Sequence, residues 1–381
     1  MFFKESDINS VVETLQSGWI VQGPKVKEFE NKWSTFTGCR HSIAVTSCTN
    51  ALHLSLTALG FGPGDEAIVP AFTWISTANV VEHLGGKVIF CDIDLKTFNI
   101  DVNDLKNKIS KKSKVIMPVH LFGFPAEMDQ VLSIAKENNL LVVEDAACGF
   151  GAMYKGQHVG TFGNTGCFSF HPRKSISTGE GGMITTNDSA LCDKIRSLRD
   201  HGVSKMDKKN TTILKPYLLP DFTMAGYNQR MTDFQAALGL SQLNRANYIL
   251  QERQNIAIRY EEEFQSINWL KTPIRKQIIK HGYQSYPCLI RPEKISIKNI
   301  NEINLIRNTL MDKLMQSGIF TRPATHAVHM LSYYANKYNY KPEDYPNSYF
   351  ANNCSISLPL YSGMKEDEID YVIHNVKSFK I

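Results

Sequence analysis

The chain has 381 residues, of which 43% are hydrophobic and 21% charged, and its formal net charge is +5 from 42 basic and 37 acidic residues. These values are ordinary for a soluble globular protein and allow a large hydrophobic core. The small basic excess is scattered, which argues against nucleic acid as a partner but is compatible with a small anionic substrate. The sequence shows no signal-peptide pattern and no run of about 18 apolar residues, so no membrane partner is expected.

The eight cysteines are spread along the chain, and none of them forms a C-x-x-C pair. Neither a zinc site nor a thioredoxin-like motif is indicated, and we expect no metal. Several cysteines lie in apolar runs, such as Cys91 in KVIFCDID. This usage favours a reducing, cytoplasmic location over a disulfide scaffold.

The first two thirds of the sequence alternate helical patterns with short apolar strands. Helices are expected at 28–37, 50–59 and 128–138, and strands at 66–72, 87–92, 114–121, 140–145, 167–170 and 182–186. Continuous apolar strands that alternate with helices indicate a mainly parallel sheet covered on both faces.

The pattern changes at Thr232, where long helical periodicity begins and continues to about Phe264. A strand is expected at 283–290, and helices are expected at 303–317 and 365–378. We therefore predict a large α/β domain over residues 1–240 and a smaller α+β domain over residues 241–381.

A lysine lies in the loop between the last two strands of the large domain, in the segment Cys167-Phe-Ser-Phe-His-Pro-Arg-Lys174-Ser-Ile-Ser-Thr-Gly-Glu-Gly-Gly182. A lysine that bonds to a carbonyl group needs limited access to water, and neighbouring glycines let a flat cofactor approach the backbone. The alternative is an exposed loop lysine beside a glycine turn, and the local pattern alone favours that alternative.

Two further segments carry weaker signals. Asp145 ends the apolar strand 140–145, so its carboxylate would lie at the carboxyl edge of the sheet, where it could pair with a protonated pyridine nitrogen or cap a helix. Thr49 and Asn50 precede an amphipathic helix, whose N-terminus would bind phosphate or would simply be capped by these residues.

Together, these segments resemble the nucleotide-sugar aminotransferases of the DegT/StrS group, which are fold-type I pyridoxal-phosphate enzymes. The resemblance runs from Gly18-Trp-Ile-Val-Gln-Gly23 to Ser357-Leu-Pro-Leu-Tyr-Ser-Gly-Met364, and its most specific part is S-F-x-x-x-K-x-x-x-T-G-E-G-G from Ser169 to Gly182. It implies a large domain on a mainly parallel seven-stranded sheet, a small C-terminal α+β domain, and pyridoxal 5'-phosphate as cofactor, with pyridoxamine 5'-phosphate as its intermediate form.

The resemblance also implies roles around the cofactor ring. Lys174 would link to the cofactor and move a proton between the substrate carbon and the cofactor carbon. Asp145 would keep the pyridine nitrogen protonated. Trp74 would stack on the ring face, unless it is a plain core aromatic. Cys148 stands where the family often has a glutamine that hydrogen-bonds the ring oxygen, which leaves open how that oxygen is held here.

Further implied roles concern the phosphate and the substrate. Thr49 and Asn50 would hold the phosphate together with Ser169. Asn228 matches the asparagine that reaches the phosphate of the neighbouring subunit, which implies a homodimer with shared active sites. Two further residues match the substrate side, Glu180 and His329, although a structural role for His329 is at least as well supported by the sequence.

The implied reaction moves an amino group from an amino acid, with glutamate the expected donor, to a keto sugar of a nucleoside-diphosphate sugar. The overall similarity to perosamine synthases favours a 4-keto-6-deoxyhexose and a role in polysaccharide or O-antigen biosynthesis. Enzymes that aminate carbon 3 share the same motifs, and no motif selects the nucleotide.

Two alternatives share this fold. A pyridoxal-phosphate-dependent sugar dehydratase would have histidine in place of Lys174, although His171 is close in sequence. A non-catalytic regulatory relative would not need the complete set of Lys174, Asp145, Trp74 and Ser169.

Overall fold

The computed structural model describes residues 3–204 and 219–381. Its central sheet has seven strands: β1 (His41–Val45), β2 (Glu66–Pro70), β4 (Lys87–Cys91), β5 (Ser113–Ile116), β6 (Leu141–Asp145), β9 (Thr165–Ser169) and β10 (Gly182–Thr186). The strand order is β1-β10-β9-β6-β5-β2-β4, parallel from β9 to β4 and antiparallel at β1 and β10. The predicted mainly parallel sheet is confirmed.

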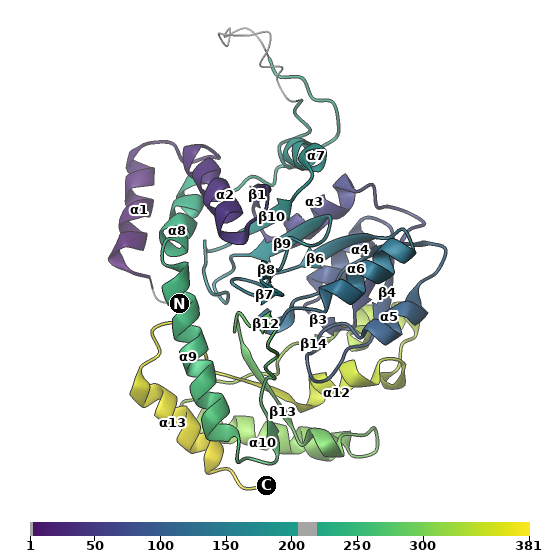
Figure 1. The fold of residues 1–381 in the computed structure, drawn as a ribbon, viewed down its shortest axis with the longest axis vertical. Helices are drawn as coiled ribbons and strands as arrows, with labels where there is room; N and C mark the ends of the chain where they lie inside the picture. The colour runs from purple at the N-terminus through teal and green to yellow at the C-terminus, as the bar shows by residue number, and fades with distance from the viewer. Residues whose placement is uncertain (1–2, 205–218) are drawn as a thin grey trace.

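The strands at the centre of this sheet are apolar on both faces because helices cover both. All five residues of β2 are buried, as are four of the five in β6, and such continuous burial is typical of parallel strands. The helices of this part are α1 (Glu5–Gln16), α2 (Pro24–Thr37), α3 (Cys48–Ala58), α4 (Ser76–His83), α5 (Val102–Lys108), α6 (Met128–Glu137), α7 (Ser189–Arg199) and α8 (Asp233–Leu243). Helices α1, α2 and α8 lie together at one end, and α4, α5 and α6 lie at the other (Figure 1).

One strand is shorter than the sequence predicts. The apolar run 114–121 forms β5 only as far as Ile116. Pro118 follows and has no N–H to donate to a neighbouring strand. The chain then makes one bridge, between Val119 and Asp145, before a short 3-10 helix at Leu121–Gly123.

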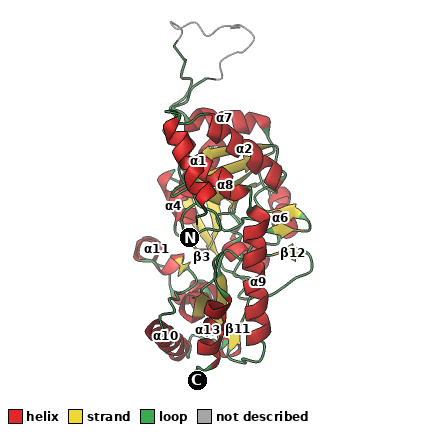
Figure 2. Cartoon of the chain, turned by 90° about the vertical axis from the view of Figure 1, so that its left-hand side faces the viewer, coloured by secondary structure: helices red, strands yellow, loops and turns green. Residues whose placement is uncertain are grey.

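The C-terminal part holds a small antiparallel sheet in the order β11-β13-β15 (Leu270–Lys271, Tyr286–Ile290 and Ser355–Leu358). Its helices are α9 (Ala246–Phe264), α10 (Ile300–Gln316), α11 (Ser332–Tyr338), α12 (Pro346–Cys354) and α13 (Glu366–Lys377), with 3-10 turns at Pro292–Lys294, Val328–Met330 and Pro342–Asp344. Helix α9 runs from the side of the large sheet to α10 and α13 (Figures 1 and 2).

The helical pattern expected from Thr232 to Phe264 forms two helices and not one, because α8 ends at Leu243 and α9 begins at Ala246. Arg245 has φ −112° and ψ 23°, which is outside helical geometry. Its guanidinium forms an ion pair with the buried carboxylate of Asp7 in α1. This contact holds the break in place and ties α1 to the start of α9.

Short strand pairings join the N-terminal and C-terminal parts. Strand β3 (Phe72–Thr73) pairs with β14 (His326–Ala327), and β7 (Met153–Tyr154) pairs with both β8 (Gln157–His158) and β12 (Ile279–Lys280). The first pairing brings the segment that follows β2 beside residues far along the chain. A domain division at residue 240 stays a prediction.

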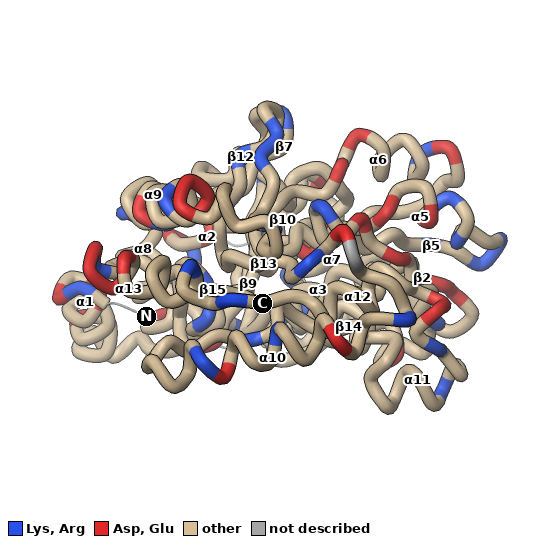
Figure 3. The backbone as a smooth tube through the Cα atoms, turned by 90° about the horizontal axis from the view of Figure 1, so that it is seen from below, with Lys and Arg blue, Asp and Glu red and all other residues tan. Residues whose placement is uncertain are grey.

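The distribution of charged residues and the state of the cysteines are as the composition leads one to expect. Basic and acidic residues are interspersed along the elements seen in Figure 3. All eight cysteines are free thiols. Among residues 3–204 and 219–381, no helix combines the length and apolarity needed to cross a bilayer.

Candidate active site

The N-terminus of α3 lies at the carboxyl end of β1 and is organised by hydroxyl groups. The Ser47 hydroxyl accepts a hydrogen bond from the backbone N–H of Asn50 at 3.1 Å, as expected of an N-cap. The Asn50 side chain donates to Thr46 at 2.6 Å, and the Thr49 hydroxyl donates to Ser76 at 3.0 Å. A helix N-terminus of this kind favours an anionic group such as phosphate.

Gly182 explains part of the glycine-rich motif. A Cβ at this position would lie 2.5 Å from the carbonyl carbon of Ser47 and 2.7 Å from the backbone nitrogen of Cys48. Only glycine lets β10 pass this close to the start of α3. The motif therefore brings the Lys174 loop and the helix N-terminus into one site.

Asp145 is held at the carboxyl end of β6 and is only 4% exposed. One carboxylate oxygen accepts from the Thr77 hydroxyl at 2.7 Å, and the other accepts from the backbone N–H of Ala147 at 3.1 Å. No helix follows between residues 146 and 152, so the helix-cap alternative is wrong. Two donors therefore hold the carboxylate in one orientation.

Lys174 lies in the loop between β9 and β10, with its side chain half-buried. Its Nζ lies 3.2 Å from the Sγ of Cys148. Burial works to lower the pKa of Lys174, but the neighbouring Cys148, Cys48 and Asp145 outweigh it, so the net pKa is raised. The alternative of an exposed loop lysine is wrong, because the amine is directed inward toward Cys148.

Trp74 follows β3 and is 56% exposed, an unusual degree for an indole. Its ring lies 5.6 Å from that of His326 in an edge-on arrangement. A plain core aromatic is therefore the wrong interpretation. An exposed indole, three residues before Thr77 in the sequence, is suited to stacking on a flat ring.

The other predicted residues vary in position. Ser169 ends β9 and accepts from the N–H of His171 at 3.4 Å. The carboxylate of Glu180 is exposed, 3.9 Å from the imidazole of His171. Asn228 is also exposed, and its backbone bridges to Asp200 at the end of α7.

His329 lies in the interior of the protein, away from the surface. Its side chain has 0% exposure, and its ring packs against Tyr345 at 4.9 Å between centroids. Burial lowers the pKa of His329 to about 4. In this conformation the imidazole presents no surface to a ligand, so the predicted substrate contact has no support from its position.

Sequence reasoning missed Thr77, which orients Asp145, and it missed the arginines beside Lys174. Arg173 precedes Lys174 in the motif, and Arg322 lies 148 positions later, beyond the reach of any local pattern. The only feature of the sequence that could have indicated Thr77 is its hydroxyl group, three residues after Trp74.

The residues present fit pyridoxal phosphate. The α3 N-terminus offers backbone donors for a phosphate, and Asp145 offers a fixed carboxylate for a pyridine nitrogen. Trp74 offers an exposed ring face, and Lys174 offers an amine directed inward.

Comparisons with known proteins point the same way. The family of DegT/DnrJ/EryC1/StrS aminotransferases matches residues 2–377. The chain is 38% identical over 373 residues to the spore coat polysaccharide biosynthesis protein SpsC of Bacillus subtilis, covering 98% of this chain and 94% of that one. It is 35% identical over 370 residues to GDP-perosamine synthase of Escherichia coli O157:H7, covering 97% and 94%.

The fold has a close match among solved structures. Spr1654 of Streptococcus pneumoniae, assigned provisionally as a sugar aminotransferase, superposes in its PMP form with a TM-score of 0.91 at 30% identity, covering 99% of this chain and 97% of that one. Its PLP form superposes with a TM-score of 0.88 at 30% identity, covering 100% and 98%. The expected fold-type I architecture is confirmed.

Proposed function

The chain belongs to the DegT/DnrJ/EryC1/StrS aminotransferase family, and on this premise we propose that it moves the amino group of glutamate to a keto sugar of a nucleoside-diphosphate sugar. The proposed acceptor is a 4-keto-6-deoxyhexose. The inward position of Lys174, with its Nζ beside Cys148 and near the fixed carboxylate of Asp145, carries the proposal. Similarity to GDP-perosamine synthase and to SpsC supports a sugar acceptor and a role in polysaccharide biosynthesis.

When bound, pyridoxal phosphate supplies an electron sink for the negative charge left on the substrate carbon after deprotonation. Lys174 would take the proton from that carbon with its neutral Nζ and return it in the second half of the reaction. Asp145 would hold a proton on the pyridine nitrogen. Thr77 and the N–H of Ala147 donate to that carboxylate and orient it.

Binding and orientation would come from the surrounding elements. Thr49, Asn50 and Ser169 would hold the phosphate at the start of α3, and Trp74 would cover one face of the ring. Cys148 would contact the ring oxygen in place of the family's usual glutamine. Glu180, exposed at the edge of the Lys174 loop, would face the substrate side.

We also propose a homodimer whose sites are shared, with Asn228 of one subunit reaching the phosphate bound by the other. The exposed side chain of Asn228 supports this arrangement. A cytoplasmic location is proposed from the cysteine usage, in which all eight thiols are free.

The first test is a visible absorbance scan of the purified protein before and after addition of glutamate. We expect a band of lysine-linked cofactor that glutamate converts to the pyridoxamine form, and Lys174→Ala should lack both the band and the conversion. The glutamate-treated enzyme is then offered 4-keto-6-deoxyhexoses and 3-keto sugars linked to GDP, UDP or dTDP, with products identified by mass spectrometry.

The same experiment separates the alternatives. A product that has lost a sugar hydroxyl without gaining an amine would indicate a dehydratase. Failure of the wild-type protein to bind added pyridoxal phosphate would indicate a non-catalytic relative and would sink the proposal.

A further inference from the structure

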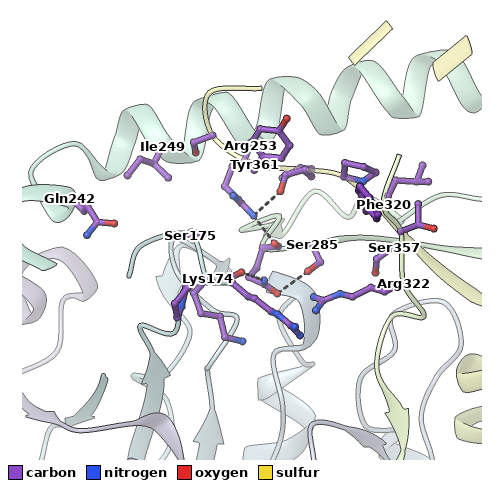
Figure 4. Close-up of a pocket in the computed structure, with 18 of the residues that line it drawn as sticks. Lys174, Ser175, Gln242, Ile249, Arg253, Ser285, Phe320, Arg322, Ser357 and Tyr361 are labelled. Atoms are coloured by element: carbon purple, nitrogen blue, oxygen red, sulfur yellow. Dashed lines mark hydrogen bonds between the residues drawn. The ribbon is translucent and has the colours of Figure 1, made fainter. Parts of the chain in front are cut away.

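A cavity of about 390 Å³ opens beside Lys174 (Figure 4). It lies between the Lys174 loop, helix α9, the start of β13, and the segments 320–322 and 357–362. Five cationic residues line it, and none of its lining residues is Asp or Glu: the five are Arg173, Lys174, Arg245, Arg253 and Arg322. The cavity therefore carries a concentrated positive charge.

The guanidinium groups of two of these arginines already have partners within the protein. Arg245 forms an ion pair with Asp7. Arg253 donates to the backbone carbonyl of Gln284 at 2.6 Å and to that of Tyr283 at 2.9 Å. Both guanidinium groups therefore already have partners within the folded chain.

Arg173 and Arg322 are different. Within the described ranges, neither guanidinium has an ion-pair or hydrogen-bond partner, and both side chains are exposed at the cavity. Figure 4 shows Arg322 extending from the wall opposite Lys174 toward it. Burial and the positive charge of Arg173 lower the pKa of Arg322, so the two cations are close enough to repel each other. A bound anion would relieve that repulsion.

The same cavity holds hydroxyl groups without partners. In the part of the chain that the structure describes, the buried hydroxyl oxygens of Ser175, Thr321, Ser357 and Ser362 make no hydrogen bond. Ser175 and Ser357 are only 8% and 6% exposed. Buried hydroxyls are normally paired, so their concentration here indicates a place for a ligand with acceptor oxygens.

Arg322 and Ser357 are held side by side. The backbone N–H of Ser357 donates to the carbonyl oxygen of Arg322 at 2.8 Å, which places the two residues on paired segments. Thr321 precedes Arg322. One wall of the cavity thus presents a cation flanked by two donors, and the opposite wall presents Arg173 next to Lys174.

We propose that Arg322 and Arg173, with the hydroxyls of Thr321 and Ser357, bind the carboxylates of the amino-acid donor. This inference rests on the proposed function, because it takes Lys174 as the reacting amine. An arginine guanidinium matches a carboxylate in planar, two-pronged geometry. These residues would be binding and specificity residues, and they would account for the choice of an acidic amino acid as donor.

The position of the charge favours the donor over the nucleotide. The α-carboxylate of an amino acid is one bond from the carbon that loses its proton. The diphosphate of a sugar nucleotide is separated from the keto carbon by the hexose ring. Arg173 is the sequence neighbour of Lys174, and Arg322 lies near enough to Cys148, which contacts Lys174, to be influenced by it electrostatically. An anion site this close to the Lys174 amine suits the carboxylate of the amino-acid donor better than the diphosphate of the sugar nucleotide.

The test uses holoenzyme variants Arg322→Gln, Arg322→Lys and Arg173→Gln. Arg291→Gln, a substitution of an arginine that pairs with Glu302 away from the cavity, is the matched control. L-glutamate is titrated against the cofactor absorbance, without any sugar. We expect Arg322→Gln to raise the glutamate concentration for half conversion by about tenfold to a hundredfold, as loss of a charge-assisted contact should. Arg322→Lys should recover part of the loss, Arg173→Gln should show a smaller rise, and the control should match the wild type.

A second measurement does not depend on turnover. Glutarate, a dicarboxylate without an amine, is titrated by calorimetry into the same holoenzymes, alongside GDP, UDP and dTDP. Binding of glutarate that Arg322→Gln weakens, with nucleotide binding unchanged, supports the proposal. Wild-type holoenzyme that does not bind glutarate, or Arg322→Gln that weakens nucleotide binding alone, would overturn it. If glutarate binds but glutamate converts nothing, the proposed function fails while the carboxylate site stands.

Discussion

The Nζ of Lys174 lies 3.2 Å from the Sγ of Cys148, which occupies the position where the resembled family often has glutamine. In this contact the Lys174 amine donates, and the thiol sulfur is a weak acceptor that favours the protonated amine. Cys148 is among the neighbours that raise the pKa of Lys174 against the opposing effect of burial. The neutral amine needed to react with a carbonyl is therefore reached at a higher pH than it would be without Cys148.

We predict that Cys148→Ala lowers the pH at which the apoenzyme takes up pyridoxal phosphate at half its maximal rate. Removing a group that raises a pKa lets the amine lose its proton at lower pH. The rate of uptake, followed by absorbance between pH 6 and 10, measures the midpoint. Cys148→Ser is the conservative control, and turnover in both variants should fall by less than about tenfold. An unmoved midpoint in Cys148→Ala would show that the contact has no influence on the amine.

The second prediction concerns Asp145, which accepts from Thr77 at 2.7 Å. Asp145→Asn should keep the fold and the cofactor but lower kcat/KM by on the order of 100-fold or more, as loss of a preorganised charge does. Thr77→Val removes one neutral donor and should cost only about twofold to tenfold. Steady-state kinetics measure kcat/KM for each variant, and the cofactor content shows whether the cofactor is retained. Asp145→Asn with near-normal kcat/KM would reject the role assigned to the carboxylate.

The positions of Lys174 and Asp145 could be predicted because each stands in a contiguous motif at the end of an apolar strand. Thr77 could not, since its contact with Asp145 joins segments 68 positions apart and depends on the order β6-β5-β2 in the sheet. The same reason hides Arg322, which reaches the cavity through the pairing of its segment with β15. A single sequence indicates where strands form, but it does not indicate which strands lie next to each other in a sheet.

The fold shows a similar division. Apolar strands that alternate with helices are enough to predict a mainly parallel sheet. The break between α8 and α9 is not visible in the sequence, because neither glycine nor proline marks it and the ion pair of Arg245 with Asp7 forms only in the folded chain. The early end of β5, in contrast, follows from Pro118 and could have been read from its position.

A third prediction tests whether the active sites are shared. Asn228→Ala should weaken retention of pyridoxal phosphate by about tenfold to a hundredfold, the usual cost of one hydrogen bond to a charged group. Equilibrium dialysis measures the affinity. Asn336→Ala, at another exposed asparagine, should leave it unchanged.

Mixing the variants Asn228→Ala and Lys174→Ala gives a sharper answer. If each site takes Lys174 from one subunit and Asn228 from the other, a mixed dimer has one intact site and one doubly defective site. Activity and tight cofactor binding should then reappear on mixing after dissociation and reassociation. If both residues of a site come from the same chain, no mixture contains an intact site, and the shared-site proposal is wrong.

The last prediction concerns stability in acid. His158 is 4% exposed and His329 is 0% exposed, and burial lowers the pKa of each to about 4 from an ordinary value of 6.5. The folded protein therefore keeps both rings neutral where the unfolded chain binds protons. Stability should fall as the pH drops from 6.5 toward 4, by about 2 kcal/mol per histidine between pH 7 and pH 5. Urea unfolding at both pH values measures the loss.

His329→Phe isolates the contribution of one ring. Phenylalanine can keep the edge-on contact with Tyr345 but binds no proton. The variant should therefore lose about 2 kcal/mol less than the wild type between pH 7 and pH 5, whatever its stability at pH 7. His374→Asn, at an exposed histidine in α13, should keep the wild-type pH dependence. An equal loss in His329→Phe and in the wild type would mean that His329 is reached by solvent in the native protein, and the imidazole would then return as a residue able to contact the substrate.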